Sequence, residues 1–274
     1  MNMQPHSQPS QPDLELSYFD IQAYMGTTKH MGGLETTREL IELCHIGQHS
    51  HVLDVGCGVG ATACYLVQKY GCSVTGIDRH ESMVAQSQER AKKEGVEQST
   101  RFRVADARDM PFQDSTFDAV LCESVLTFVE EKQRALDEFA RVLKPGGWMG
   151  LNEEYWRKTP PPPELVQAAR RMWNIEPAIL TLADWKTMLE NAGLDEIIAR
   201  PYQFNVQRES TQVKRYHLSD MWNMFYRTLT LYFKNPAFRQ YLKRQRRLPK
   251  KLFDYLGYGV FVGRKIHHGM VSPT

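Results

Sequence analysis

Acidic side chains stand where successive predicted strands end. Asp54 precedes a glycine-rich turn, and Asp78 and Asp106 close the next two predicted strands. Glu123 and Glu153 follow two later strands. In an open α/β sheet the carboxyl ends of parallel strands border one crevice, and ligands bind there. Carboxylates can accept hydrogen bonds, attract a cation or take up a proton. This spacing therefore predicts a small-molecule site in which acidic residues have separate roles.

The glycine-rich turn, residues 54–60, reads Asp-Val-Gly-Cys-Gly-Val-Gly and joins a predicted strand to a predicted helix. Its glycines allow a ligand to approach the main chain closely. Taken alone the turn is ambiguous, because Gly56 and Gly58 also satisfy a dinucleotide fingerprint, with Asp78 near the acidic position of that motif. A carboxylate at Asp54 would repel a pyrophosphate but suits the ammonium group of a methionine moiety. The turn therefore favours adenosylmethionine over a dinucleotide.

Short motifs downstream support the same cofactor, since Asp106 ends a strand where an adenine amino group could donate to it. The motifs are Gly-Ile-Asp at 76–78, Ala-Asp-Ala at 105–107, Phe-Asp-Ala-Val at 117–120 and Arg-Val-Leu-Lys-Pro-Gly-Gly at 141–147. With these motifs the chain resembles the class I S-adenosylmethionine-dependent methyltransferases, within the small-molecule group that includes the ubiquinone and menaquinone C-methyltransferases. The resemblance covers about residues 30–204 and the last predicted strand.

The resemblance implies S-adenosylmethionine as cofactor, with S-adenosylhomocysteine as product, and it implies roles for the residues that match the motifs. Gly56 and Gly58 would line the methionine part of the cofactor, and Asp54 would hold its amino group. Asp78 would accept hydrogen bonds from the ribose hydroxyls, with Arg79 beside it. The same acidic residues could instead only cap helices or turns.

The resemblance also concerns the adenine ring and a lid. Asp106 and Ala107 would contact the adenine. The segment Lys-His-Met-Gly-Gly that contains His30 and Gly32 is similar to a His-x-Gly loop that closes over the cofactor in some small-molecule methyltransferases. Tyr24 could contribute to the same lid. The alternative is a loop whose glycine pair merely precedes a helix.

Carboxylates after the fourth and fifth predicted strands are the candidates for catalysis. The sulfonium already carries an activated methyl group, so the protein supplies positioning and, where the acceptor must lose a proton, a base. Glu153 is the candidate base, and Glu123 is a candidate to touch cofactor or substrate. Helix capping and a solvated loop are the structural alternatives. The reacting atom of the acceptor, carbon, nitrogen or oxygen, stays open.

A basic and aromatic stretch, residues 207–254, lies between the last two predicted strands and should form a helical cap over the substrate mouth. No acidic residue occurs between Met221 and Phe253, whereas nine residues there are basic. Four apolar residues in this stretch have helical spacing, which predicts that they share one face of a helix and cover a partly apolar acceptor. They are Trp222, Phe225, Tyr226 and Leu229. The cations could meet an anionic group, solvent or, through 221–253, a membrane surface. Nucleic acid is disfavoured, because Asn-Glu-Glu-Tyr replaces the Asn-Pro-Pro-Tyr type of motif at 152–155.

The elements that must position these residues alternate between strand and helix. Strands are predicted at 51–55, 73–77, 101–105, 117–122, 148–152, 194–204 and 258–262, and helices at 61–70, 81–94, 132–143 and 182–191. This alternation predicts an α/β fold with a doubly wound, mostly parallel seven-stranded sheet, Rossmann-like, with the cap inserted before the last strand. The predicted divisions are a disordered tail (1–13), a cofactor-binding domain (14–206 and 255–274) and the cap (207–254).

Composition narrows the remaining possibilities. The net charge of +2 names no partner, and the apolar runs are too short to span a bilayer. The beginning of the sequence has no signal-peptide pattern, and the five cysteines lack metal-ligand spacing. We therefore expect a cytoplasmic protein with free thiols, no metal and a small-molecule acceptor. The alternative is a cofactor-binding, catalytically silent partner subunit of the same fold.

Overall fold

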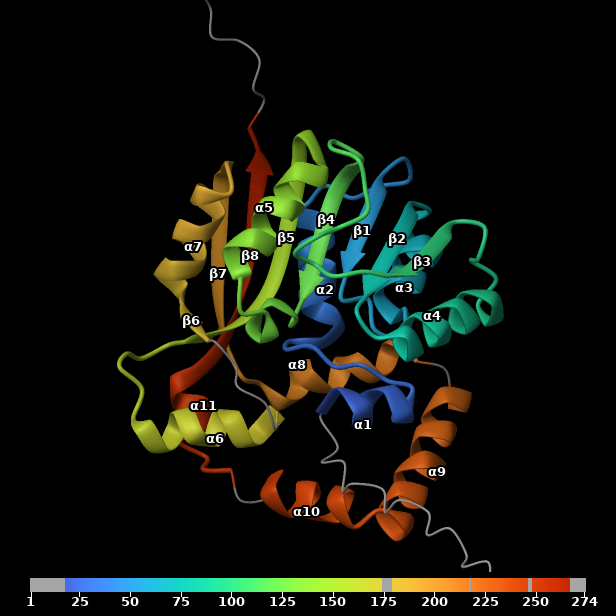
Figure 1. Cartoon of the computed structure of the whole chain (residues 1–274), viewed down its shortest axis with the longest axis vertical. Helices are drawn as coiled ribbons and strands as arrows, with labels where there is room; N and C mark the ends of the chain where they lie inside the picture. The colour runs from blue at the N-terminus through green and yellow to red at the C-terminus, as the bar shows by residue number, and fades with distance from the viewer. Residues whose placement is uncertain (1–17, 174–178, 217, 246–247, 267–274) are drawn as a thin grey trace, which may run out of the picture.

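An eight-stranded sheet forms the centre of the molecule. The computed structural model describes residues 18–173, 179–216, 218–245 and 248–266 (Figure 1). The strand order is β3-β2-β1-β4-β5-β8-β7, and β6 pairs with β5 outside this path. The strands are β1 (His51–Val55), β2 (Ser73–Asp78), β3 (Thr100–Val104), β4 (Phe117–Glu123), β5 (Leu143–Trp156), β6 (Leu180–Thr181), β7 (Leu194–Gln203) and β8 (Leu256–Lys265). All neighbours pair in parallel except β8, which is antiparallel to both β5 and β7. The predicted fold class is confirmed.

Helices cover both faces of the sheet and its carboxyl edge. The long elements are α1 (Tyr18–Met25), α2 (Gly33–Leu43), α3 (Ala61–Tyr70), α4 (Glu81–Lys93), α5 (Lys132–Val142), α6 (Pro163–Trp173), α7 (Leu182–Asn191), α9 (Leu218–Lys234) and α10 (Pro236–Gln245). Shorter ones are η1 (Leu126–Phe128), α8 (Val206–Ser210), η2 (Thr211–Arg215) and α11 (Leu252–Tyr255). In Figure 1, α5 and α7 lie in front of the sheet, whereas α1, α6, α9 and α10 lie together beyond its lower end.

Two apolar clusters, one on each face, explain why the central strands are nearly continuous apolar runs. Leu53 and Val120 pack with side chains of α5 and α7, among them Phe139 and Trp185. Val52 and Leu121 pack with side chains of α2 and α3 on the other face. Strands buried on both sides read as apolar runs, as is typical of parallel sheets covered by helices. Strands β2 and β3 are added on one side of β1, and β4 and β5 on its other side, so the strand order reverses between β1 and β4; this switch point places the crevice beside the glycine turn.

β5 extends four residues beyond the predicted end at Asn152. β8 pairs with it continuously from Trp148 opposite Arg264 to Trp156 opposite Leu256. The hydrogen bonds that β8 supplies keep residues 153–156 in the sheet, although their sequence looks like the start of a loop. The extension matters for the site, because it places Glu153 inside a strand and not after one.

The segment between β7 and β8 forms α8, η2, α9, α10 and α11. α1, which was not predicted, packs against α9 and α10 through Ile21, Leu231 and Phe238. The predicted tail at 1–13 lies outside the described residues, and the division into domains stays a prediction. Within the described ranges, every helix is too short or too polar to span a lipid bilayer.

Candidate cofactor and acceptor site

A cavity of about 1060 Å³ lies between the carboxyl edge of the sheet and the helices beyond it. Ligand pockets typically measure about 300–1,000 Å³, so this space can hold a cofactor and a second molecule together. One half is lined by the glycine turn and the ends of β1, β2 and β3. The other half is lined by residues of α1, α6, α9, α10 and the end of β7.

The glycine turn is held in one conformation by its neighbours. Gly56 and Gly58 have φ angles of +70° and +52°, which only glycine adopts at little cost. The nitrogens of Gly56 and Cys57 donate to the carbonyl oxygen of Ile77 at 2.8 and 2.9 Å. A Cβ at Gly56 would collide with Val125, and one at Gly58 would collide with Thr28. The turn therefore presents bare main chain to the cavity.

Asp78 and Arg79 lie side by side at the end of β2, and both line the cavity. Asp78 Oδ2 accepts from Gly58 N at 3.1 Å, and Oδ1 accepts from His80 N at 2.9 Å. The carboxylate is thus held by main chain while retaining free lone pairs. The Arg79 guanidinium lies 5.7 Å from the centre of the Phe19 ring. This arrangement suits a pair of ribose hydroxyls.

Asp106 and Ala107 line the cavity beyond β3. The Asp106 carboxylate is about half exposed and forms a bidentate pair with Arg108, at 3.0 Å from Nε and 2.8 Å from Nη2. The hydrogen bonds from Arg108 lower the Asp106 pKa to about 2. Asp106 is therefore ionised at neutral pH, with lone pairs left for an adenine amino group.

Asp54 is buried, 4% exposed, and lines the cavity. Its Oδ2 has no hydrogen-bond partner among the described residues. Burial and then the charge of Glu123 raise its pKa to about 8, whereas Arg215 acts in the opposite direction. A buried carboxyl group without a partner is costly. It fits a bound cation, and the ammonium group of a methionine moiety would supply one.

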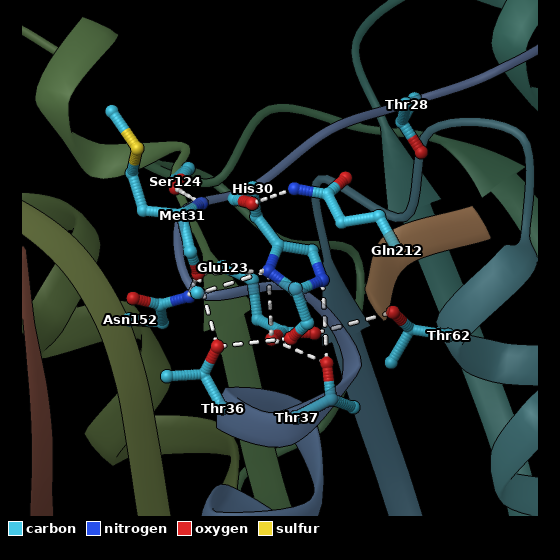
Figure 2. A network of polar contacts seen from close by, with 12 residues as sticks. Thr28, His30, Met31, Thr36, Thr37, Thr62, Glu123, Ser124, Asn152 and Gln212 are labelled. Atoms are coloured by element: carbon cyan, nitrogen blue, oxygen red, sulfur yellow. Dashed lines mark hydrogen bonds and ion pairs between the residues drawn. The ribbon is translucent and has the colours of Figure 1, made fainter. Parts of the chain in front are cut away.

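His30 and Glu123 connect the loop before α2 to the end of β4, and both line the cavity (Figure 2). Glu123 accepts hydrogen bonds from Thr37 at 2.9 Å and Thr62 at 3.2 Å, and its Oε2 lies 3.5 Å from His30 Nδ1. Burial lowers the pKa of His30 to about 4, so the ring is neutral at pH 7. Asn152 donates to the Met31 carbonyl at 2.6 Å and fixes the same loop.

Comparison with known proteins gives the family. A family model described as a methyltransferase domain matches residues 53–151. An uncharacterized protein of Haemophilus influenzae is 31% identical over 178 residues, covering 64% of this chain and 70% of that protein. The chain belongs to the class I S-adenosylmethionine-dependent methyltransferases. The cofactor of this class is S-adenosylmethionine. The narrower likeness to ubiquinone and menaquinone C-methyltransferases stays a prediction.

Two named proteins are similar to this methyltransferase, one in sequence and one in fold. Phosphoethanolamine N-methyltransferase 3 of Arabidopsis thaliana is 32% identical over 170 residues, which cover 61% of this chain. The chain spans only 33% of that relative's length. The structure of Haemonchus contortus phosphoethanolamine N-methyltransferase 2, with phosphomonomethylethanolamine and S-adenosylhomocysteine, superimposes with a TM-score of 0.71 at 18% identity. It covers 93% of this chain and 59% of that one.

The position of Glu153 argues against its predicted role as base. It is fully buried inside β5 and does not line the cavity. Its carboxylate accepts from the nitrogens of Val125, Leu126 and Thr127 at 2.8–2.9 Å and from the Thr127 hydroxyl at 3.0 Å. In this methyltransferase Glu153 therefore holds the turn after β4. Glu154 lines the cavity instead, and burial raises its pKa.

Two predicted lid residues lie outside the cavity lining. Tyr24 is 43% exposed on α1, and its contact to the cap is a hydrogen bond from Arg227 to its carbonyl oxygen. Gly32, with φ +79°, donates its N–H to Glu209 at 2.7 Å. Glycine is needed there because a Cβ would meet Thr36 and Tyr258. Gly32 shapes the loop that carries His30, whereas Tyr24 does not line the cavity, and its role in a lid stays a prediction.

The aromatic face predicted on the cap points away from the acceptor. Trp222 and Tyr226 are each 72% exposed, and Phe225 is 55% exposed. They do share one side of α9, but that side faces solvent. Other apolar residues line the acceptor half, and they are Met172, Trp173, Phe204, Val213, Phe238, Tyr241 and Leu242.

Sequence reasoning also missed residues of η2 and α3. Arg215 and Gln212 line the cavity, and Gln212 Nε2 donates to the His30 carbonyl oxygen. Thr62 lines it as well, from the first turn of α3. No spacing in the sequence links residue 215 to residue 62, since only the packing of η2 on α3 brings them together.

Proposed function

We propose that this methyltransferase transfers the methyl group of S-adenosylmethionine to a small-molecule acceptor with a substantial apolar part. One observation carries the proposal: a single cavity joins an acidic half at the strand ends to an apolar half under the cap. In the transfer the acceptor atom forms a bond to the methyl carbon while the carbon–sulfur bond breaks. The electron pair stays on sulfur, which leaves S-adenosylhomocysteine.

The acidic half supports the cofactor roles. Asp54 would hold the amino group, Gly56 and Gly58 the methionine chain, and Asp78 the ribose hydroxyls. Arg79 would flank the ribose, with Asp106 and Ala107 at the adenine. All of these residues line the cavity. The catalytically silent alternative is disfavoured, since an intact cofactor half opens directly into an acceptor chamber.

Where the acceptor must lose a proton, His30 and Glu123 are the groups placed to receive it. Both line the cavity, and Glu123 ends β4, the strand next to the one that leads into the glycine turn. The neutral imidazole of His30 can accept a proton, and the carboxylate of Glu123, 3.5 Å away, can stabilise the resulting cation. Glu123 is thus proposed as a member of this pair, in place of a separate base at Glu153.

The proposal is tested by a screen with isotopically labelled methyl donor and mass readout of the products. The acceptors should include apolar amines, phenols and carbon acids, with phosphoethanolamine as a polar comparison. We expect methyl incorporation into apolar acceptors and little into phosphoethanolamine. Preference for phosphoethanolamine would contradict the acceptor class, and failure to bind S-adenosylhomocysteine in calorimetry would contradict the cofactor site.

We also propose that the outer side of α9 contacts an anionic membrane surface, as access to an apolar acceptor would require. Seven apolar side chains on this helix are exposed: Leu218, Trp222, Phe225, Tyr226, Leu229, Tyr232 and Phe233. Exposed cations on the same helix, Arg227 and Lys234, complement an anionic surface. Trp and Tyr are favoured at membrane interfaces because their rings combine an apolar body with a polar atom.

Sedimentation with vesicles tests this contact. Binding to vesicles containing phosphatidylserine, weaker binding to phosphatidylcholine alone, and loss on W222S/Y226S substitution are expected. Val104→Ser, which changes an apolar residue on β3 that is 50% exposed, is the control. Absence of binding, with a dimer in solution that W222S/Y226S dissociates, would assign the face to a second copy of the chain.

A further inference from the structure

Arg215, the last residue of η2, is a buried cation with an unused edge. It is 8% exposed and lines the cavity. Its Nη1 donates to Thr62 Oγ1 at 2.9 Å. Its Nε and Nη2 have no hydrogen-bond partner among the described residues. These two nitrogens share one edge of the guanidinium, and that edge is the one that binds a carboxylate through two parallel hydrogen bonds.

The surroundings of Arg215 place this edge next to the glycine turn. Thr62 belongs to the first turn of α3, which begins directly after Gly60. The titratable groups around Arg215 are Asp54 and His30. The charges of Arg215 and Glu123 act on the pKa values of both groups, and the charge of Asp78 acts on that of Asp54. An Arg buried without a full set of partners is costly, so its position calls for an anion.

Asp54 and Arg215 together form a pair of opposite, incompletely partnered groups in one part of the cavity. Asp54 lacks a partner at Oδ2, and Arg215 lacks partners at Nε and Nη2. Both residues line the same cavity, and the charge of Arg215 acts on Asp54. A ligand group that satisfies both must carry an ammonium and a carboxylate close together, which is the chemistry of an α-amino acid.

We propose that Arg215 binds the carboxylate of the methionyl group of S-adenosylmethionine through Nε and Nη2, while Asp54 holds the ammonium group. This inference rests on the proposed function, which puts the cofactor in this cavity. It adds a cofactor-binding residue from the segment between β7 and β8, outside every cofactor motif of the sequence. The cofactor site is therefore complete only when η2 is packed on α3.

The test compares S-adenosylmethionine with decarboxylated S-adenosylmethionine, which keeps the amine and the sulfonium but lacks the carboxylate. Calorimetric dissociation constants are measured for the wild-type chain and for Arg215→Met. The wild type should prefer the complete cofactor about ten- to a hundredfold, as expected when a hydrogen-bonded charge pair is removed. In R215M affinity for the complete cofactor should fall by a similar factor, and that for the decarboxylated compound should change less than about twofold.

Two further variants make the outcome specific. Lys214→Met removes an exposed neighbouring cation that does not line the cavity, and it should leave both affinities unchanged. Arg215→Lys keeps the charge but loses the two-pronged edge, and it should reduce the preference several-fold. If circular dichroism shows that R215M does not fold, R215K replaces it in the comparison of the two compounds.

Three results would overturn the inference. The first is a wild-type chain that binds both compounds equally well, and the second is an unchanged preference in R215M or R215K. The third is unchanged cofactor affinity in R215M with a raised KM for an anionic acceptor, which would assign Arg215 to the acceptor. If the wild type binds neither compound nor S-adenosylhomocysteine, the proposed function itself fails.

Discussion

The two halves of the cavity are built in different ways. Apart from Arg215 on η2, the cofactor half consists of short segments that each follow one strand, and Asp78 is fixed there by a main-chain hydrogen bond from Gly58. The acceptor half consists of apolar side chains from α6, from α10 and from Phe204 just after β7, far apart in sequence. Local sequence thus determines the first half, whereas tertiary packing determines the second. A change in one half should leave the other largely intact.

Among the substitutions that separate the two halves, Asp78→Ala should have the largest effect, and that effect is on cofactor affinity. Loss of hydrogen bonds to a charged group costs about 1.5–3 kcal/mol, a ten- to hundredfold loss of S-adenosylhomocysteine affinity. Asp106→Ala is the control and should cost less, because Asp106 is half exposed and screened by solvent. Calorimetry on both folded variants decides the matter, and equal affinities for D78A and wild type would contradict the ribose assignment.

Glu153→Gln should affect both halves, because Glu153 holds the turn that supplies Val125 and Phe128 to the cavity. An amide places a donor where main-chain donors now point, and one unsatisfied buried group costs about 1–3 kcal/mol. We expect a lower free energy of unfolding in urea, together with weaker cofactor binding. Glu123→Gln, whose partners are hydroxyl groups that can reorient, should lose less stability. Unchanged stability with abolished turnover would return Glu153 to the role of base.

Cofactor affinity should rise with pH up to about 8. The free protein holds a proton on Asp54 below its pKa of about 8, whereas a bound ammonium group favours the ionised carboxylate. Below pH 8, cofactor binding therefore releases a proton from Asp54. Each unit by which the pH is lowered then weakens the cofactor affinity by up to about tenfold. Calorimetry of S-adenosylhomocysteine binding between pH 6 and 8 measures this slope. Asp54→Asn should bind more weakly at pH 8 and lose the slope; a slope that survives in D54N would have another origin.

Phe204→Ala should change only the acceptor half. Phe204 is 36% exposed, lines the cavity and stacks on Phe253 with ring centres 4.7 Å apart. Removing part of an apolar contact costs about 1 kcal/mol, so the KM of an apolar acceptor should rise about fivefold. S-adenosylhomocysteine affinity should stay the same. Phe233→Ala, on the outer side of α9 and outside the cavity lining, is the control and should alter neither quantity in an assay without lipid.

The same contrast explains how far the sequence could predict the structure. Apolar strands and glycine turns are local signals, so β1 to α5 lie close to their predicted ranges. Glu153 was misplaced because no local signal shows that β8 keeps β5 extended to Trp156. The outward face of α9 was misassigned for a related reason: helical spacing shows that Trp222 and Phe225 share a side, but not what that side meets. Arg215 lies outside every motif of the sequence, so no local signal marks it as a site residue.

β8 has a consequence for the order in which the molecule is assembled. It leaves the ribosome after β7 and all of the cap, yet its place is between β5 and β7. β7 is paired to the rest of the sheet through β8, with Tyr202 opposite Tyr258 and Ala199 opposite Phe261. Until β8 inserts, β5 offers an unpaired strand edge from Trp148 to Trp156, and unpaired edges are sites of aggregation. Because the chain is synthesised from its N-terminus, β1 to β5 can pair before β8 is available, and the open edge of β5 closes only when β8 inserts.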